Sequence, residues 1–429
     1  MSSFEQPSGR ASAGASPTGP PRLAERGTSR IATRIGRLGT ETAFAVAAET
    51  TALAAEGHEV FAFHIGDLNL GTPANIVEAT FRAARDGRTG YCPPFGIPEL
   101  REAIADDVSA SHGIAYRHGN VAVQPGGKPV IGKFLLALME PGDEVLYPNP
   151  GYPIYESQIE FHGGRAVPYG YLESPDGFSI DLEGIEAALS PRTRLLILND
   201  LQNPLGAECS KEELARLAEL VERHDLLVLC DEAYFDIRYE GSSRSFAALP
   251  GMAERCVLLF TFSKRYAMTG WRLGAAIGPE EVIDVIGRLN VNDESCTNQF
   301  VQVGGVEGLR GDQSGANRIV EVLRERRDVA VAGLDKAPGI RCHAPRGTFY
   351  LFPNVTEAMA RIGERDVESF RRRLLRDTGV STCSRVHFGR PSESETEHYL
   401  RLAYAGIDAT RIDEGLRRLC AYLEQAQDA

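Results

Sequence analysis

The sequence predicts an α/β fold in which a mostly parallel sheet, flanked by helices, is followed by a smaller α+β domain. Short apolar runs alternate with helical patterns between about residues 76 and 305, which is typical of parallel strands joined by helices. The runs are continuous over four or five residues, which suits strands buried on both faces. Near residue 306 the rhythm changes, and a long helical pattern precedes two short strands.

The elements follow in a regular order along the chain. Residues 1–30 are rich in Ser, Gly, Pro and Ala and are predicted to form a disordered tail. A helical pattern from Glu41 to Gly57 leads to a short strand in EVFAFHIGD, residues 59–67. The predicted strands of the large domain are VAVQP (121–125), EVLY (144–147), RLLIL (194–198), LLVLC (226–230), CVLLF (256–260) and LGAAI (273–277). Predicted helices include 97–111, 128–139, 211–224 and 280–290.

The last part of the chain contains a helical pattern at 316–336 and then the strands TFYLF (348–352) and RLAYA (401–405). We therefore expect four parts. These are a disordered tail at 1–30, an N-terminal segment at 31–75 that packs with the small domain, a large cofactor-binding domain at 76–305 and a C-terminal small domain at 306–429.

Composition narrows the class of protein. The chain has 429 residues, 43% hydrophobic and 24% charged, which is enough for a large buried core. A formal net charge of −13 argues against nucleic acid or an anionic membrane as the main partner. No apolar run approaches a membrane span, and the start lacks the apolar core of a secretory signal, so we expect a cytoplasmic protein. Eight scattered cysteines and nine histidines show no zinc-site spacing, so no metal site is expected.

The segment TFSKRYAMTGWRLG (261–274) places a lysine just after a predicted strand. Lys264 follows Thr261 and Ser263, and Arg272 comes eight residues later. A lysine amine can condense with an aldehyde and later move a proton, while hydroxyls and an arginine fork bind a dianionic phosphate. These are the groups that pyridoxal phosphate (PLP) requires. For Lys264 alone, the alternative is a surface lysine after a buried strand.

Asp231 lies at the end of the predicted strand LLVLC, where α/β sheets place ligand groups. A carboxylate there can pair with the pyridine nitrogen of PLP and keep it protonated. Tyr234, three residues later, is a candidate donor to the phenolic oxygen of the cofactor ring. The alternative role for Asp231 is a helix cap.

Other candidates lie at further junctions between strands and helices. Gly126, Gly127 and Lys128 open a helix after VAVQP, and bare backbone N–H groups at a helix N-terminus can bind phosphate. Tyr152 in YPNPGYPIY offers an aromatic face to stack on the cofactor ring, and a packed tyrosine is the alternative. Asn203 in NDLQNPLG is a second candidate for the phenolic oxygen, with an ordinary Asn-Pro turn as the alternative.

Arg401 begins the apolar strand RLAYA. An arginine on such a strand is costly unless it is paired. A bidentate clamp on the carboxylate of an amino acid would offset that cost. A structural ion pair is the alternative.

On these residues the chain resembles the fold-type-I PLP enzymes of the class I/II aminotransferase family, close to bacterial members of the aspartate aminotransferase kind. The resemblance covers about residues 38–425. The motifs that carry it, in the family's order and spacing, are GYCPPFGIPELR, VQPGGK, PGDEVLYPNPGY, DEAY, FSKRYAMTGWRLG, GTFYLF and RLAYA.

The resemblance implies a role for each candidate. Lys264 would hold PLP as a Schiff base and Asp231 would bind the pyridine nitrogen. Tyr234 and Asn203 would contact the phenolic oxygen, and Tyr152 would stack on the ring. The groups implied for the phosphate are Gly126, Gly127, Lys128 through its backbone, Thr261, Ser263 and Arg272. Arg401, assisted by the backbone of Gly66, would clamp the substrate carboxylate. Tyr91 would reach the phosphate site of a neighbouring subunit, which implies a homodimer with shared active sites.

Three segments depart from the common family pattern. The family's Gly-Glu-Pro-Asp appears here as Gly66-Asp67-Leu68-Asn69, after His64-Ile65. Its Asn-Pro-Thr-Gly appears as Asn203-Pro204-Leu205-Gly206, and a loop reads VNDESCTN at 291–298. We expect these differences to fall near the substrate pocket.

The resemblance implies chemistry at the α-carbon of an L-amino acid through an external aldimine and a quinonoid. The first reading is an aminotransferase that produces a 2-oxo acid. The second is the oxygen-dependent PLP oxidase and hydroxylase branch acting on L-arginine, with 2-oxo or hydroxylated products and ammonia. His64 is the candidate catalytic histidine of that branch, and a pocket-filling histidine is the alternative. Asp67 is a candidate partner for a guanidinium.

Overall fold

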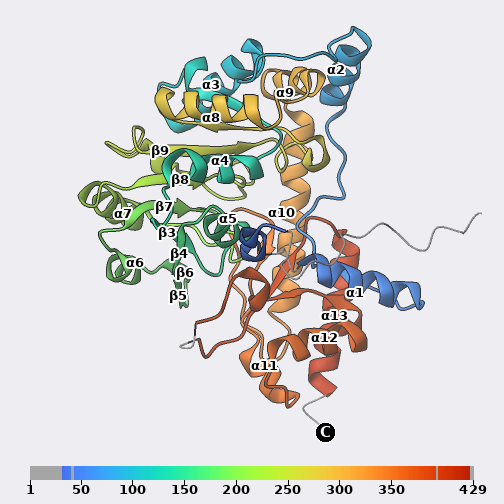
Figure 1. Ribbon diagram of the computed structural model, residues 1–429. Coiled ribbons are helices and arrows are strands. Elements are labelled where there is room, and N and C mark those ends of the chain that lie inside the picture. Colours follow the sequence, from blue (N-terminus) through green and yellow to red (C-terminus); the bar gives the residue numbers. More distant parts are fainter. Residues whose placement is uncertain (1–30, 40–42, 393–394, 426–429) are drawn as a thin grey trace, which may run out of the picture.

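The computed structural model describes residues 31–39, 43–392 and 395–425, so the predicted tail at 1–30 lies outside the described residues. Figure 1 shows a large lobe built around a sheet and a smaller lobe that contains the C-terminal helices. The long helix α10 (Ser314–Leu334) extends from one lobe to the other.

The large lobe is organised by one seven-stranded sheet. Its strands, in spatial order, are β2 (Val121–Gln124), β10 (Gly274–Ile277), β9 (Cys256–Thr261), β8 (Leu227–Asp231), β7 (Thr193–Leu198), β3 (Glu144–Pro148) and β4 (Arg165–Tyr169). β10 runs antiparallel to both of its neighbours, and the other adjacent pairs are parallel. The predicted α/β fold with a mostly parallel sheet is therefore confirmed.

Helices cover both faces of this sheet. One face packs against α3 (Pro98–His112), α6 (Leu182–Ala188) and α7 (Lys211–Arg223), and the other against α4 (Lys128–Leu138), α5 (Ile154–Phe161) and α8 (Glu280–Asn292). On β8, Val228 and Cys230 join the first apolar cluster and Leu229 joins the second. Because successive side chains of a strand point to opposite faces, double coverage explains the continuous apolar runs in the sequence.

Local signals set the bounds of the helices. Ser210 Oγ accepts the Glu213 N–H at 3.1 Å, and the Glu213 carboxylate accepts the Ser210 N–H at 2.6 Å. This capping box satisfies two of the free N–H groups at the start of α7. Leu214, Leu217 and Val221 then recur at helical spacing and are buried.

The small lobe has its own apolar core, to which the N-terminal part of the chain contributes. Its elements after α10 are β11 (Tyr350–Leu351), α11 (Thr356–Arg361), α12 (Val367–Thr378), β12 (Val380–Ser381), β13 (Cys383–Ser384), β14 (Leu400–Ala403) and α13 (Ala409–Gln425). β1 (Phe61–Ala62) pairs with β12 in parallel, and α1 (Ala43–Ala55) reaches the same lobe through a hydrogen bond between Thr50 and Ser381. The four-part division of the chain stays a prediction, which this packing supports.

The predicted strand at 59–67 is shorter than expected, since only Phe61 and Ala62 are paired in the ladder. Residues 64–67 leave the ladder and turn along the wall of a cavity. The remaining elements are α2 (Ala74–Arg85) and α9 (Gln299–Arg310), which pack on each other, the hairpin β5 (Tyr171–Ser174) and β6 (Gly177–Ile180), and five short 3₁₀ segments.

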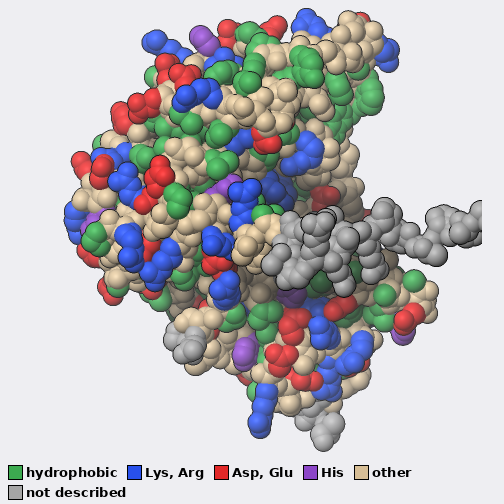
Figure 2. Space-filling view, in the orientation of Figure 1, with side chains coloured by type: hydrophobic (Ala, Val, Ile, Leu, Met, Phe, Trp, Pro, Cys, Tyr) green, Lys and Arg blue, Asp and Glu red, His purple; other side chains and the backbone are tan. Residues whose placement is uncertain are grey.

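The surface carries charges of both signs. On the face shown in Figure 2, acidic and basic side chains of the described residues are interspersed. Within residues 31–39, 43–392 and 395–425, every helix is too short or too polar to span a membrane.

Candidate active site

The carboxyl ends of the parallel strands meet at one edge of the sheet and open into a cavity of about 550 Å³. Strands β3, β7, β8 and β9 all end at this edge. Ligand groups of α/β folds gather at such an edge because the strands share one direction. The small lobe and the N-terminal segment supply the opposite wall, with Gly66, Tyr350, His387, Phe388 and Arg401 among the lining residues.

Lys264 projects into this cavity from the turn after β9. Its Nζ donates a hydrogen bond to the backbone oxygen of Gly66 at 3.2 Å. It also lies 5.9 Å from the centre of the Tyr234 ring and 5.3 Å from that of Phe349. Burial lowers the pKa of Lys264 to about 8. The amine is therefore available as a neutral nucleophile and base close to neutral pH.

Asp231 ends β8, and its carboxylate is held on both oxygens. Tyr155 donates to Oδ2 at 2.6 Å, and the Ala233 N–H donates to Oδ1 at 3.1 Å. Asn199 supports the same strand end by donating to the Asp231 backbone oxygen at 2.9 Å. Burial raises the pKa of Asp231, whereas the Tyr155 hydroxyl acts to lower it.

The sequence reading missed Tyr155 and Asn199. Tyr155 lies three residues after Tyr152 at the start of α5, so it falls near Tyr152 on the same turn. The motif YPNPGYPIY therefore held a signal for it.

The residues that are predicted to bind the phosphate lie together around the N-terminus of α4. Gly126 has φ +97°, and a Cβ there would collide with the Arg272 guanidinium. A Cβ on Gly127 would collide with Leu259. Thr261 Oγ1 donates to Ser263 Oγ at 2.9 Å, and Arg272 Nη1 donates to the Thr269 oxygen at 2.7 Å. Glycine is needed at both positions because the backbone must approach these groups closely.

Three further predicted residues line the same cavity. The Tyr234 hydroxyl lies 2.8 Å from that of Tyr350. Asn203 is buried, and its Oδ1 has no hydrogen-bond partner among the described residues. The Tyr152 ring meets the Tyr155 ring edge-on, with centroids 5.7 Å apart. A buried, unpaired amide oxygen is costly and indicates a missing partner.

Arg401 is 4% exposed, and its guanidinium lies between two aromatic rings. The Tyr350 and Phe388 ring centres are each 4.8 Å from it. Its Nη2 donates to the His64 backbone oxygen at 2.5 Å, while Nε has no hydrogen-bond partner among the described residues. In the part of the chain that the structure describes, Arg401 forms no ion pair with a carboxylate, and its role as a clamp stays a prediction.

The N-terminal candidates His64, Gly66 and Asp67 also line the cavity. His64 is 3% exposed, and burial, followed by the charge of Arg401, lowers its pKa to about 4. A Cβ on Gly66 would collide with the Tyr350 hydroxyl, so only glycine fits there. Tyr91 is 89% exposed and lies outside the cavity of its own chain.

Two of the segments that depart from the family pattern do not line this cavity. Leu205 packs in a small apolar cluster with Phe352 instead of lining the cavity. The loop 291–298 also lies away from the cavity, and its Glu294 accepts a hydrogen bond from the Lys133 ammonium at 2.5 Å. A buried lysine needs a carboxylate partner, which explains what holds this loop. Neither Leu205 nor the loop lines the cavity of its own chain, and the expectation that they lie near the substrate pocket stays a prediction.

Known proteins of one family are similar to this chain in sequence and in fold. The family described as "Aminotransferase class I and II" matches residues 58–419. A probable aspartate/prephenate aminotransferase of Aquifex aeolicus is 34% identical over 401 residues, which are 92% of this chain and 99% of the relative. The solved aspartate aminotransferase of Rhizobium meliloti has a TM-score of 0.85 at 30% identity, covering 92% of this chain and 99% of that one. The Thermus thermophilus aspartate aminotransferase with maleate has a TM-score of 0.81 at 30% identity, covering 92% and 100%.

These relatives confirm the predicted family, fold type and cofactor class. Nothing in them points to the oxygen-dependent arginine reaction. The chain belongs to the class I and II aminotransferase family and is a PLP-dependent enzyme of the transaminase kind.

Proposed function

We propose that this aminotransferase uses Lys264 as its catalytic base, holds the substrate carboxylate with Arg401 and takes L-aspartate or a similar acidic amino acid as amino donor. The observation that carries the proposal is the placement of two groups in one cavity. One is a buried lysine amine with a pKa of about 8, and the other is a buried guanidinium without a carboxylate partner among the described residues.

The residues present fit PLP. Asn203 Oδ1, which has no hydrogen-bond partner among the described residues, and the Tyr234 hydroxyl are polar atoms that would face the phenolic oxygen of the cofactor ring. Because Gly126 and Gly127 carry no side chain, nothing fills the space beside Arg272 and Leu259 at the start of α4, and the helix N-terminus stays open to a phosphate. The residues proposed to hold the phosphate are Gly126, Gly127, Lys128 through its backbone, Thr261, Ser263 and Arg272. Tyr152 would stack on the ring, and Asp231 would pair with its nitrogen.

Bound PLP supplies an aldehyde that condenses with amines and a ring that accepts electrons from the α-carbon. The protein supplies the rest. Asp231, whose carboxylate accepts a hydrogen bond from the Tyr155 hydroxyl, would pair with the pyridine nitrogen and keep it protonated. The Lys264 Nζ would remove the proton from the α-carbon and hold it, because a pKa of about 8 lets this amine gain and lose a proton near neutral pH. Arg401 fixes the carboxylate and so orients the α-carbon toward Lys264.

The choice of an acidic substrate is supported by the cavity wall and by the names of the relatives. Besides Arg272, the cationic side chains of Arg401 and Lys128 line the cavity. The Lys128 ammonium lies 5.7 Å from the centre of the Tyr152 ring. Two acidic side chains, Asp67 and Asp231, also line the cavity, and Asp67 is exposed. Two cationic groups favour a dicarboxylate over the guanidinium of arginine.

We further propose a homodimer in the cytoplasm. Tyr91 is exposed, lies outside the cavity of its own chain and is the proposed contact to the phosphate site of a second copy. The eight cysteines are free thiols, which suits a reducing compartment.

The test is a half-reaction. Purified holoenzyme is mixed with L-aspartate without any 2-oxo acid, while absorption and oxygen are followed. We expect one equivalent of oxaloacetate per site, no oxygen uptake and recovery of the original absorption band on adding 2-oxoglutarate. The Lys264→Ala variant should lose the reaction. Sustained oxygen uptake with ammonia release, or no half-reaction with any amino acid, would refute the proposal.

A further inference from the structure

One polar residue of the cavity has no part in the functions assigned above. His387 lies in the 3₁₀ segment Arg385–Phe388, is 8% exposed and lines the cavity. The next residue, Phe388, packs on the Arg401 guanidinium at 4.8 Å. His387 therefore faces the same space as Arg401. Among the described residues it makes no hydrogen bond to Lys264 or to the residues proposed to hold the phosphate.

The contacts of Nδ1 are compatible with either tautomer of the ring. The backbone N–H of Ser384 donates to His387 Nδ1 at 3.1 Å, and the backbone oxygen of Ser384 lies 3.2 Å from the same nitrogen. Nδ1 accepts from the N–H when the hydrogen is on Nε2, and it donates to the oxygen when the hydrogen is on Nδ1. Within the described residues Nε2 has no hydrogen-bond partner. The Nε2 side of the ring is therefore the side available to a ligand, and a ligand oxygen that only accepts selects the tautomer with the hydrogen on Nε2.

The imidazole remains neutral and is held in place by charged neighbours. Burial is the main reason that the pKa of His387 lies below its ordinary value. Glu368, with Oε1 3.5 Å from Nδ1, acts to raise that pKa, while the charges of Arg371 and Arg401 act to lower it. A neutral imidazole with its hydrogen on Nε2 has one donor to offer to a substrate.

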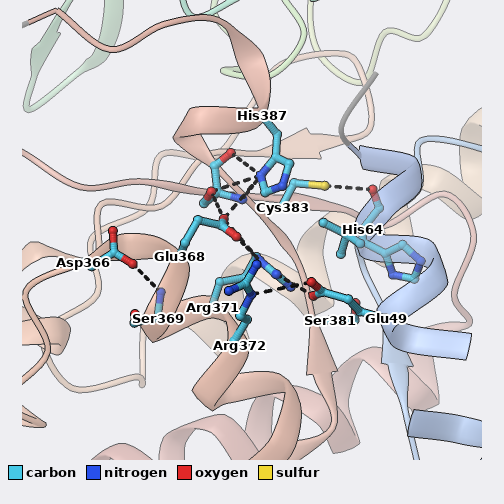
Figure 3. A network of polar contacts seen from close by, with 12 residues as sticks. Glu49, His64, Asp366, Glu368, Ser369, Arg371, Arg372, Ser381, Cys383 and His387 are labelled. Carbon is cyan, nitrogen blue, oxygen red and sulfur yellow. Dashed lines mark hydrogen bonds and ion pairs between the residues drawn. The ribbon is translucent and has the colours of Figure 1, made fainter. Parts of the chain in front are cut away.

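A network of buried charges fixes this turn to two helices. Figure 3 shows Glu368 of α12 between His387 and Arg371. The Arg371 side chain is 1% exposed, and its Nε donates to Glu368 at 3.1 Å while Nη2 donates to Glu49 of α1 at 2.6 Å. The Ser384 hydroxyl also donates to Glu368. The turn that carries the ring is thus tied to α12 through Glu368 and, through Arg371, to α1, which lowers the entropic cost of presenting the ring to a ligand.

We infer that His387 is a specificity-determining residue whose Nε2–H donates a hydrogen bond to an oxygen on the side chain of the bound amino acid. The inference rests on the proposed function, because it assumes that Arg401 already holds the α-carboxylate and that the cofactor groups occupy the rest of the cavity. The substrates it favours carry a carboxylate, carboxamide or hydroxyl side chain. Aliphatic side chains of the same size leave this donor unpaired and are disfavoured.

The test measures binding without turnover. 2-Methyl-L-aspartate and 2-methyl-L-leucine have similar side-chain shapes and lack the α-hydrogen, so each can bind without being transaminated. Their dissociation constants are measured from the absorption change of the holoenzyme. We expect the wild type to prefer the aspartate analogue and His387→Leu to reduce that preference by about tenfold to a hundredfold.

Two variants serve as controls. His387→Gln restores an N–H donor near the position of Nε2 and should recover most of the preference. His224→Gln changes an exposed histidine just beyond α7, far from the cavity lining, and should leave both constants unchanged. The melting temperature of each apoprotein shows whether the fold is intact.

The possible outcomes separate the two ideas. If His387→Leu weakens both analogues equally, or neither, the inference is overturned while the aminotransferase proposal stands. If the wild type binds neither analogue, the amino acid site itself is wrong and the inference fails with it. A preference lost in His387→Leu and recovered in His387→Gln supports the inference.

Discussion

The bond between Tyr155 and Asp231 gives a sharp test of the cofactor site. The Tyr155 side chain is fully buried, and its hydroxyl lies 2.6 Å from Asp231 Oδ2. Replacing Tyr155 with Phe removes one oxygen and keeps the ring that packs under the sheet edge. Among the described residues, the Asp231 carboxylate then keeps one hydrogen-bond donor, the backbone N–H of Ala233.

The magnitude follows from the kind of hydrogen bond that is lost. A bond to a buried carboxylate contributes about 1.5–3 kcal/mol. We therefore expect Tyr155→Phe to weaken PLP binding by roughly 10- to 100-fold near pH 7. Tyr155 acts to lower the pKa of Asp231, so its loss raises that pKa further above the ordinary value. Asp231 of the variant then stays protonated at a higher pH, and the deficit in PLP affinity shrinks as the pH rises.

The assay is a titration of apoprotein with PLP between pH 6 and 9, followed by absorption. Tyr169→Phe is a matched control, because Tyr169 is a buried tyrosine of the same sheet whose hydroxyl donates to the Ile197 oxygen at 2.9 Å. This control loses a neutral bond outside the cavity, so its apoprotein should lose about 1 kcal/mol of stability and keep its PLP affinity.

Two results would contradict this reasoning. One is an equal loss of PLP affinity in both tyrosine variants, which would make the effect one of packing. The other is a deficit in Tyr155→Phe that does not change with pH, which would mean that Asp231 is not the group affected.

Two further predictions concern the opposite wall of the cavity. Arg401→Lys removes the planar guanidinium between Tyr350 and Phe388, so KM for the amino donor should rise at least about tenfold while PLP absorption is unchanged. An unaltered KM in steady-state assays would show that Arg401 does not bind the substrate carboxylate. The pKa of His64 is about 4 in the folded protein, against an ordinary value of 6.5. As the pH falls between these two values the unfolded state binds the proton first, so the free energy of unfolding decreases by up to about 3 kcal/mol. His64→Asn should lose less stability than the wild type between pH 6.5 and 4 in urea unfolding, and identical pH curves would show that His64 titrates normally.

Much of the large domain could be predicted from local patterns. Strands β3, β7, β8 and β9 begin and end within one or two residues of their predicted bounds. They were recognisable because burial on both faces demands continuous apolar runs. The two-residue strand β1 was not, because a short edge pairing leaves almost no pattern in the sequence.

The cofactor residues were predictable for a related reason. Parallel strands bring their carboxyl ends to one edge, so a polar residue that follows each strand reaches a common site. Asp231, Asn203, Ser263 and Lys264 all come at or shortly after such an end and all line the cavity. Family resemblance supplied the role of each residue, and the roles themselves stay proposals.

The segments 291–298 and Leu205 show where that reasoning stopped. Both depart from the family pattern, and a departure alone does not reveal where a segment lies. Glu294 accepts a hydrogen bond from the buried Lys133, and Leu205 packs in an apolar cluster. These partners belong to other elements, so no local pattern points to them.

The sequence by itself determined the fold class, the cofactor and the lysine that we propose as catalytic, because these depend on strand ends and on spacing within single motifs. Only the tertiary structure decided how the polar groups are paired. Tyr155 and Asp231 are 76 residues apart, and Arg401 and His64 are 337 apart. The bonds to His387 Nδ1 are local, but the Glu49–Arg371–Glu368 network that holds its turn joins α1 to α12. Such contacts arise from the way the lobes pack, and a one-dimensional pattern does not encode which distant partners will meet.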